Sequence, residues 1–214
     1  MNSFCIIGLG KFGRSLALSL AADKKQVLVI DTDADKVADI ADFVTDAVVG
    51  DPTNEAVLYA AGVRNYECAV ICFTENINDN VLLTIMLKDI GVKKVVARAI
   101  NEGHHRVLER IGADLIVFPE KDMGEKLAFK LTKEKVTEYI EFSGCTLVET
   151  EIPSDWAGKD LITLNIRRRY GVNVIAVISA DGKLDPSPKP DRIFKKGDKV
   201  LIIGSDEAIG KFTK

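Results

Sequence analysis

Over its first 118 residues the sequence alternates short apolar runs with amphipathic segments. The apolar runs are brief, uninterrupted and rich in Val and Ile, as strands buried on both faces are. They lie at Phe4–Ile7, Val27–Asp31, Ala47–Gly50, Ala69–Phe73, Val95–Ala99 and Leu115–Phe118. Helix-like segments separate them at Phe12–Ala22, Ala34–Ala41, Asn54–Ala61, Asn78–Ile90 and Gly103–Ile111. Six strands joined by five helical crossovers predict a doubly wound parallel sheet of the α/β class.

The predicted helices carry further local signals. Gly62, Gly91 and Gly112 stand where left-handed C-caps are expected. In the fourth helix, apolar residues at helical spacing predict the side that faces the core, namely Val81, Leu82, Ile85, Met86 and Ile90.

Pro119 interrupts the alternation. Residues 120–140 predict a helix outside the strand–helix series, which is called the crossover helix below. In the remainder, "CTLVETEI" alternates as a half-exposed strand does, and "GKDLITLNIRRRYG" is typical of a helix closed by Gly171. The strands "VNVIAVIS" and "DKVLIIGS" flank a proline-rich stretch, expected to be a loop or a poor edge strand. The sequence thus predicts an N-lobe (1–119), a crossover helix (120–140) and a small α+β C-lobe (141–214).

The composition argues against several classes of protein. The net charge of −3 over 214 residues disfavours nucleic-acid binding through a basic surface. No apolar run approaches the roughly 18 residues of a membrane span, and the N-terminus lacks the pattern of a signal peptide. Three of the four cysteines lie in strand-like runs and none forms a C-x-x-C pair, so reduced, buried thiols in a cytosolic protein are expected.

The first strand ends in "GLGKFG", which places Gly8, Gly10 and Gly13 in a G-x-G-x-x-G pattern. The motif follows a strand and opens a helix within a β–α–β unit, which is the context of a nucleotide-phosphate site. Gly8 permits the tight turn, Gly10 lets the backbone approach a phosphate, and Gly13 lets the helix pack close to the strand. The helix N-terminus then offers free N–H groups to an anion. The alternative is a glycine turn that only packs.

Asp31 ends the second strand, where an acid accepts hydrogen bonds from ribose hydroxyls. Its carboxylate would repel a 2′-phosphate, which argues against NADP. Lys11, inside the turn, either brings a cation to the phosphates or is a solvated surface lysine.

Other polar side chains follow the strands at the same edge of the sheet. Asp51 and Thr53 in "GDPTN", and Thr74 and Asn76 in "FTENIND", lie where a nucleotide would sit, but they also suit helix N-caps. Arg98 interrupts the apolar strand "VVARA", where a charge is costly unless it is used. We expect its guanidinium to face phosphates rather than an internal carboxylate.

These motifs, with "VVGDPTNE", "GADLIVFPEKDMG" and "NIRRRYGVNVIAV", resemble an RCK (KTN) protein, the cytosolic gating subunit of Ktr- and Trk-type potassium uptake systems. The resemblance runs nearly end to end and is nearest to the Ktr type. It implies a Rossmann-type N-lobe that binds ATP or ADP, with NAD or NADH as alternatives. It also implies homodimers that build an octameric ring and an integral-membrane potassium-translocating partner, which would hold the cytoplasmic chain at the inner face of the membrane.

The resemblance also implies particular contact residues. The nucleotide contacts would be Gly8, Gly10, Lys11, Phe12, Gly13, Asp31, Thr32, Asp33, Asp51, Thr53, Thr74, Asn76 and Arg98. Lys11 stands where the family often has Arg, so the turn has a point charge instead of a bidentate fork. Glu120 matches a position linked to a divalent cation shared between neighbouring sites; alternatively, it is a first-turn acid that stabilises its own helix.

In the C-lobe, five residues match positions that bind cyclic di-AMP in related Ktr subunits: Arg168, Asn173, Val174, Ile175 and Pro190. The arginines of "RRR" are equally suited to the C-terminal end of a helix dipole.

Two other functions stay open from the residues alone. An NAD(H)-dependent oxidoreductase needs a general acid or base beside the nicotinamide, but the two histidines, His104 and His105, lie together before an N-lobe helix. A redox-sensing Rossmann regulator needs a DNA-reading segment and a basic face, and we find neither in the sequence. We therefore predict a nucleotide-sensing regulatory subunit and not an enzyme.

Overall fold

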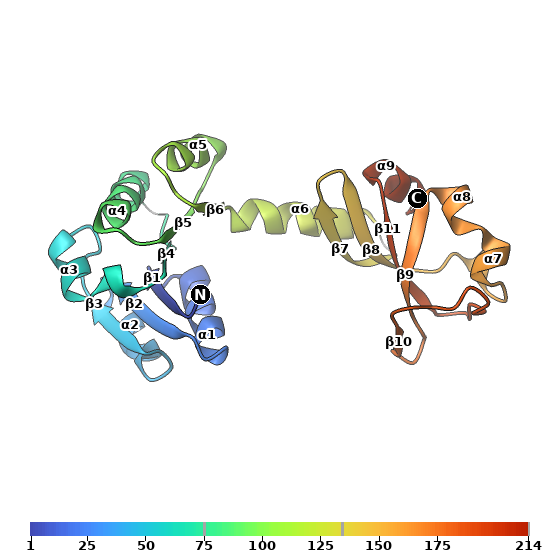
Figure 1. Ribbon diagram of the computed structural model, residues 1–214, viewed down its shortest axis with the longest axis horizontal. Helices are drawn as coiled ribbons and strands as arrows, with labels where there is room; N and C mark the ends of the chain where they lie inside the picture. The colour runs from blue at the N-terminus through green and yellow to red at the C-terminus, as the bar shows by residue number, and fades with distance from the viewer. Residues whose placement is uncertain (75, 134, 214) are drawn as a thin grey trace. The chain divides into compact units, whose positions relative to one another are not determined.

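The computed structural model describes residues 1–74, 76–133 and 135–213. The chain forms two compact units, Met1–Glu120 and Lys121–Lys214 (Figure 1). Among the described residues, no helix has both the length and the apolar content needed to cross a bilayer.

The first unit is built on a six-stranded parallel sheet, which confirms the predicted fold class. The strand order is β3-β2-β1-β4-β5-β6. The strands are β1 Ser3–Ile7, β2 Gln26–Asp31, β3 Asp46–Val49, β4 Cys68–Ile71, β5 Lys94–Arg98 and β6 Leu115–Val117. The connections are α1 Lys11–Ala22, α2 Ala34–Ala41, α3 Glu55–Ala60 with a 3₁₀ turn at Val63–Asn65, α4 Ile77–Ile90 and α5 Glu102–Arg110.

Helices cover both faces of this sheet (Figure 1). One core lies under α3, α4 and α5 and the other under α1 and α2. Along β1, Cys5 and Ile7 enter the first core and Ile6 enters the second, because successive side chains of a strand point to opposite faces. Burial on both faces is why the strand sequences are continuously apolar. The thiols of Cys5, Cys68 and Cys72 are buried and unpaired, as predicted, and Cys145 is half-buried.

The predicted core face of α4 is partly wrong. The buried residues are Asn80, Leu83, Thr84 and Leu87, whereas Leu82 and Ile85 are exposed. The spacing of apolar residues predicted the wrong face because two of the four buried residues are polar. Asn80 is tolerated there because its amide donates to the carbonyls of Phe73 and Arg98, at 3.0 and 3.3 Å.

The predicted helix over residues 120–140 is also wrong in its second half. Helix α6 spans Pro119–Thr132, and Val136–Phe142 forms strand β7. Strand β7 pairs antiparallel with β8, Cys145–Glu151, and Phe142 lies opposite Cys145 across a turn in which Gly144 has φ +76°. A turn ending in glycine and a strand rich in β-branched and aromatic residues outweigh the helical pattern.

The second unit contains an antiparallel five-stranded sheet, ordered β10-β9-β11-β8-β7. Its remaining strands are β9 Val172–Ile178, β10 Leu184–Asp185 and β11 Lys199–Gly204. The proline-rich stretch contributes only the two-residue edge strand β10, as predicted. Trp156, in the 3₁₀ turn Ser154–Trp156, is fully buried, and its ring lies 5.4 Å from that of Phe194 and 5.5 Å from that of Phe212.

The predicted helix "GKDLITLNIRRRYG" is two short helices instead. They are α7 Leu161–Leu164 and α8 Ile166–Tyr170, separated by Asn165 at φ +43°. Asparagine tolerates the left-handed region, so it ends α7. Gly171 closes α8 at φ +72°, as predicted. A final helix, α9 Asp206–Phe212, was not predicted.

The corrected face of α4 makes a testable prediction. Leu83→Ala should lower the free energy of unfolding of the first unit by about 2–5 kcal/mol, because it leaves a cavity under a fully buried side chain. The control Leu82→Ala, on the exposed side, should change it by less than about 0.5 kcal/mol. Urea unfolding followed by circular dichroism measures both, and equal effects would contradict this assignment.

Candidate functional site

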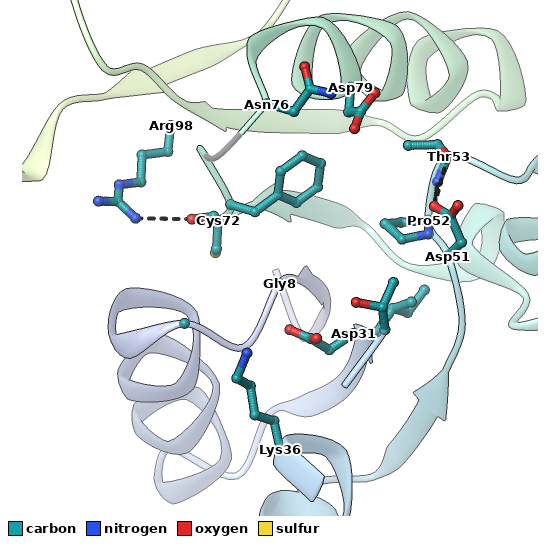
Figure 2. A pocket seen from close by; sticks show the side chains of 14 residues that line it. Gly8, Asp31, Lys36, Asp51, Pro52, Thr53, Cys72, Asn76, Asp79 and Arg98 are labelled. Carbon is teal, nitrogen blue, oxygen red and sulfur yellow. Dashed lines mark hydrogen bonds between the residues drawn. The ribbon is translucent and has the colours of Figure 1, made fainter. Parts of the chain in front are cut away.

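A cleft of about 360 Å³ opens at the carboxyl edge of the first sheet. It lies where the strand order reverses between β1 and β4, which is the ligand position in doubly wound sheets. Eight of the predicted residues line it: Gly8, Gly10, Asp31, Thr32, Asp51, Thr53, Asn76 and Arg98. Figure 2 shows Asp31 and Arg98 on different sides of Gly8, so the glycine turn lies between a carboxylate and a guanidinium.

The glycine turn has the geometry that its motif predicts. Gly8 has φ +97°, a conformation that other residues rarely adopt. A Cβ atom on Gly13 would lie 2.0 Å from the carbonyl oxygen of Gly8, so only glycine lets α1 pack this close to the turn. A Cβ on Gly10, in contrast, would meet nothing within 4 Å. Open space beside the N-terminus of α1 suits an anion that approaches the first-turn N–H groups.

Asp31 joins the turn to the end of β2. Its carboxylate accepts hydrogen bonds from the backbone N–H groups of Leu9 and Asp33. These contacts fix the side chain at the cleft and leave carboxylate lone pairs for a further donor such as a ribose hydroxyl.

The next polar pair stabilises its own loop. Thr53 donates from its hydroxyl and its backbone N–H to Asp51, at 2.7 and 2.9 Å. Both bonds lower the pKa of Asp51, and the bond from the hydroxyl has the larger effect. Asn54 caps α3, as the capping alternative predicted for this loop, and Asn76 both caps α4 and lines the cleft.

Other predicted contacts lie off the cleft wall. Gly13 is buried within α1, Lys11 is exposed in its first turn, and Asp33 caps α2 by accepting from the N–H groups of Asp35 and Lys36. Phe12 lies beneath Arg98, with the guanidinium carbon 5.6 Å from the ring centroid. Thr74 is half-buried after β4 and is not among the lining residues. A ligand role for these five residues stays a prediction.

Arg98 ends β5 at the cleft with its side chain 18% exposed. Its guanidinium donates to the carbonyl of Cys72 at 3.1 Å and to the carboxylate of Glu120. The residue therefore both faces the cleft and pairs with a carboxylate, which the sequence had presented as alternatives. No group of three potential metal ligands occurs among the described residues, so the cation role of Glu120 stays a prediction.

Two charged lining residues were missed by sequence reasoning. Lys36 reaches the cleft from the first turn of α2, and Asp79 from the first turn of α4 (Figure 2). Each residue lies in the first turn of the helix that follows a strand of the central sheet. A search for charged residues at that position in the sequence would have found both. The lining thus has three carboxylates, of Asp31, Asp51 and Asp79, and two cations, Lys36 and Arg98.

One thiol of the cleft lining and one histidine of the first unit are poorly suited to catalysis. Burial raises the pKa of the Cys72 thiol to about 12, although the charge of Arg98 acts in the opposite direction. His104 and His105 lie within α5, so their predicted position before a helix is wrong. His104 is buried there, is not among the lining residues, and has its pKa lowered by burial. Neither group is available to a ligand in the form that catalysis would need.

The five C-lobe candidates come from three segments. Arg168 is exposed on α8, and Asn173 and Ile175 are exposed on β9 while Val174 is half-buried. Pro190 is exposed in the loop after β10. The pairing with β11 shifts register between Val174 and Ala176, which turns Ile175 outward. Whether these residues form a cyclic di-AMP site stays a prediction.

The fold and cleft define a Rossmann-type domain joined to a small α+β lobe, and both parts match family models. Residues 4–119 match the TrkA-N domain and residues 146–214 match the TrkA-C domain. The Ktr system potassium uptake protein C of Bacillus subtilis (strain 168) is 38% identical over 214 residues, which are 100% of this chain and 96% of that protein.

Solved structures agree with these matches. The GsuK channel bound to NAD has a TM-score of 0.54 and 25% identity over 98% of this chain and 37% of the channel chain. GsuK bound to ADP has a TM-score of 0.53 and 27% identity over 62% of this chain and 34% of that one. This chain therefore spans well under half the length of these channel chains.

The chain belongs to the TrkA-N/TrkA-C, or RCK, family, as its motifs predicted. The family consists of regulators, so the oxidoreductase alternative is set aside and the chain is not an enzyme.

The two glycines of the turn give a matched pair of variants. Gly13→Ala should destabilise the first unit by at least about 2 kcal/mol, because its Cβ would overlap the Gly8 carbonyl and force α1 to move. Gly10→Ala should leave the unfolding free energy within about 0.5 kcal/mol, since Gly10 has φ −63° and open space around it. Urea titration of both proteins measures this difference in unfolding free energy. Equal values for the two variants would show that α1 does not pack tightly against the turn at Gly13.

Proposed function

We propose that this protein is the cytosolic, nucleotide-sensing regulatory subunit of a membrane potassium transporter or channel. The observation that carries the proposal is the full-length relationship to a Ktr potassium uptake protein. The cleft supports the sensing role, because it combines a glycine turn, a ribose-type acid and a guanidinium along one sheet edge.

The ligand we propose is ATP or ADP, with NAD or NADH as the alternative. An adenosine ribose would be held by Asp31, and the phosphates by the N-terminus of α1 and by Arg98. Structural relatives bound to NAD and to ADP support both ligand classes. With three carboxylates against two cations in the lining, a divalent cation would help to neutralise a polyphosphate there.

The proposed assembly is a homodimer that closes into a larger ring, an octamer by family resemblance. Among the described residues of α6 none is buried, and Met123, Leu127 and Leu131 are 63%, 54% and 72% exposed at spacings of four residues. A helix stripe of this kind suits burial against a second copy. The exposed Leu82 and Ile85 of α4 supply a separate surface for contacts that would close a ring.

The ligand proposal is tested by calorimetry with AMP, ADP, ATP, NAD and NADH, and with cyclic di-AMP for the C-lobe. We expect binding of adenine nucleotides without turnover. Asp31→Asn should weaken ATP and NADH alike by about 1.5–3 kcal/mol, since both carry the same ribose.

The matched control for Asp31→Asn is Asp35→Asn, which removes an exposed charge four residues away and outside the lining. Its affinities should equal those of the wild type. Equal losses of affinity in the two variants would indicate an effect of net charge instead of a contact to the ribose. Hydride transfer to or from a bound nicotinamide would contradict the proposed regulatory function.

The assembly proposal is tested by light scattering at micromolar concentration, with and without ATP. Leu127→Glu should yield monomers, because it places a charge in the α6 stripe, whereas Leu82→Glu should leave dimers but prevent larger rings. A monodisperse wild-type monomer under both conditions would contradict the proposed ring and any gating that depends on it.

A further inference from the structure

The guanidinium of Arg98 is held between three other elements. It donates to the Cys72 carbonyl after β4 at 3.1 Å, lies over the Phe12 ring of α1, and pairs with Glu120 of α6. Its Nε is buried and lacks a partner among the described residues. The carbonyl and the ring orient the side chain, so Glu120 is the one of these contacts that carries an opposing charge.

Glu120 is well placed to be exchanged. Its side chain is 61% exposed, whereas that of Arg98 is 18% exposed. A carboxylate that already faces water is readily rehydrated when its ion pair opens, while the half-enclosed guanidinium needs an anion in its place.

Glu120 is the second residue of α6, and α6 is anchored again near its other end. Phe129 stacks on Tyr139 of β7 with ring centroids 4.2 Å apart, and Lys130 bonds to Glu138 at 2.6 Å. The division between the compact units falls at Glu120 and Lys121, directly after the Arg98 pair. Most of α6 belongs to the second unit. The ion pair therefore connects the first turn of this helix to Arg98, a residue that lines the cleft.

The order of strands decides which ligands reach Arg98. Asp31 follows β2, the glycine turn follows β1, and Arg98 ends β5, three strands from β2. At a strand spacing of about 4.8 Å this is roughly 14 Å. A ribose held at Asp31 with a single phosphate over the glycine turn falls short of Arg98, and a longer phosphate chain extends toward it.

We propose that Glu120 and the distal phosphate of a bound nucleotide compete for Arg98, which makes Glu120 a specificity-determining residue for phosphate number. The inference rests on the proposed nucleotide site. Two anions cannot share one guanidinium without mutual repulsion, so Arg98 pairs with Glu120 when the phosphate tail is short and with the tail when it is long. In the second case Glu120 is released and the first turn of α6 loses its tie to β5.

The test is Glu120→Gln, measured by calorimetry in EDTA so that no divalent cation contributes. Removing the competing carboxylate should raise the affinity for ATP about two- to fivefold, the range of a partly exposed ion pair, and leave that for AMP unchanged. The matched control, Glu125→Gln, makes the same change on an exposed residue of α6 and should alter neither. In the Arg98→Lys background, which keeps the charge but not the fork, the effect of Glu120→Gln should shrink.

Hydrogen exchange of the peptide covering residues 119–127 gives a second readout. ATP, but not AMP, should speed its exchange in the wild type, and Glu120→Gln should exchange fast without ligand. An ATP affinity that is unchanged or lower in Glu120→Gln in EDTA overturns the competition. A wild type that binds no adenine nucleotide refutes the proposed function itself, which separates the two failures.

Discussion

The pairing of β1 with both β2 and β4 is the constraint on which the site depends. It places the first strand of the chain at the centre of a parallel sheet, so the turn after β1 opens where the strand order reverses. At that position α1 must turn back over the sheet within a few residues, which requires Gly8 at positive φ and Gly13 without a Cβ. The same packing brings the N-terminus of α1 to the cleft, so the geometry that stabilises the turn also presents the first-turn N–H groups there.

Around this turn both signs of charge lie along the edge of the sheet. Carboxylates follow β2, β3 and β4, whereas the cations are Lys36 in α2 and Arg98 at the end of β5. A ligand with a ribose at Asp31 and phosphates that extend toward Arg98 would span this edge. The cleft is nevertheless not a simple anion site, because its carboxylates outnumber its cations and Arg98 is already paired with Glu120. A site of this kind suits the proposed sensing role, in which the charge and length of the ligand decide which groups it contacts.

Helix α6 connects this edge to the rest of the chain. Its start is held by Arg98 through Glu120, and its last turns pack on β7 through Phe129. The apolar stripe of Met123, Leu127 and Leu131 between these ends faces solvent in a single chain. One helix therefore combines a contact to the candidate site, a surface suited to a second copy and a join to the C-lobe, and the proposed link between cleft and assembly depends on these three features.

The sequence by itself determined the doubly wound sheet, the glycine turn and the acid after β2, because continuous apolar runs and glycine spacing have few structural solutions. Only the tertiary structure decided which face of α4 is buried, since the Asn80 amide nitrogen and the Thr84 hydroxyl donate to backbone carbonyls in bonds that no periodicity reveals. The end of α6 at Thr132 likewise depends on pairing of β7 with β8. The partner of Arg98 was undecidable from the sequence, because Glu120 lies 22 residues away and meets it only when β5 and α6 are folded together.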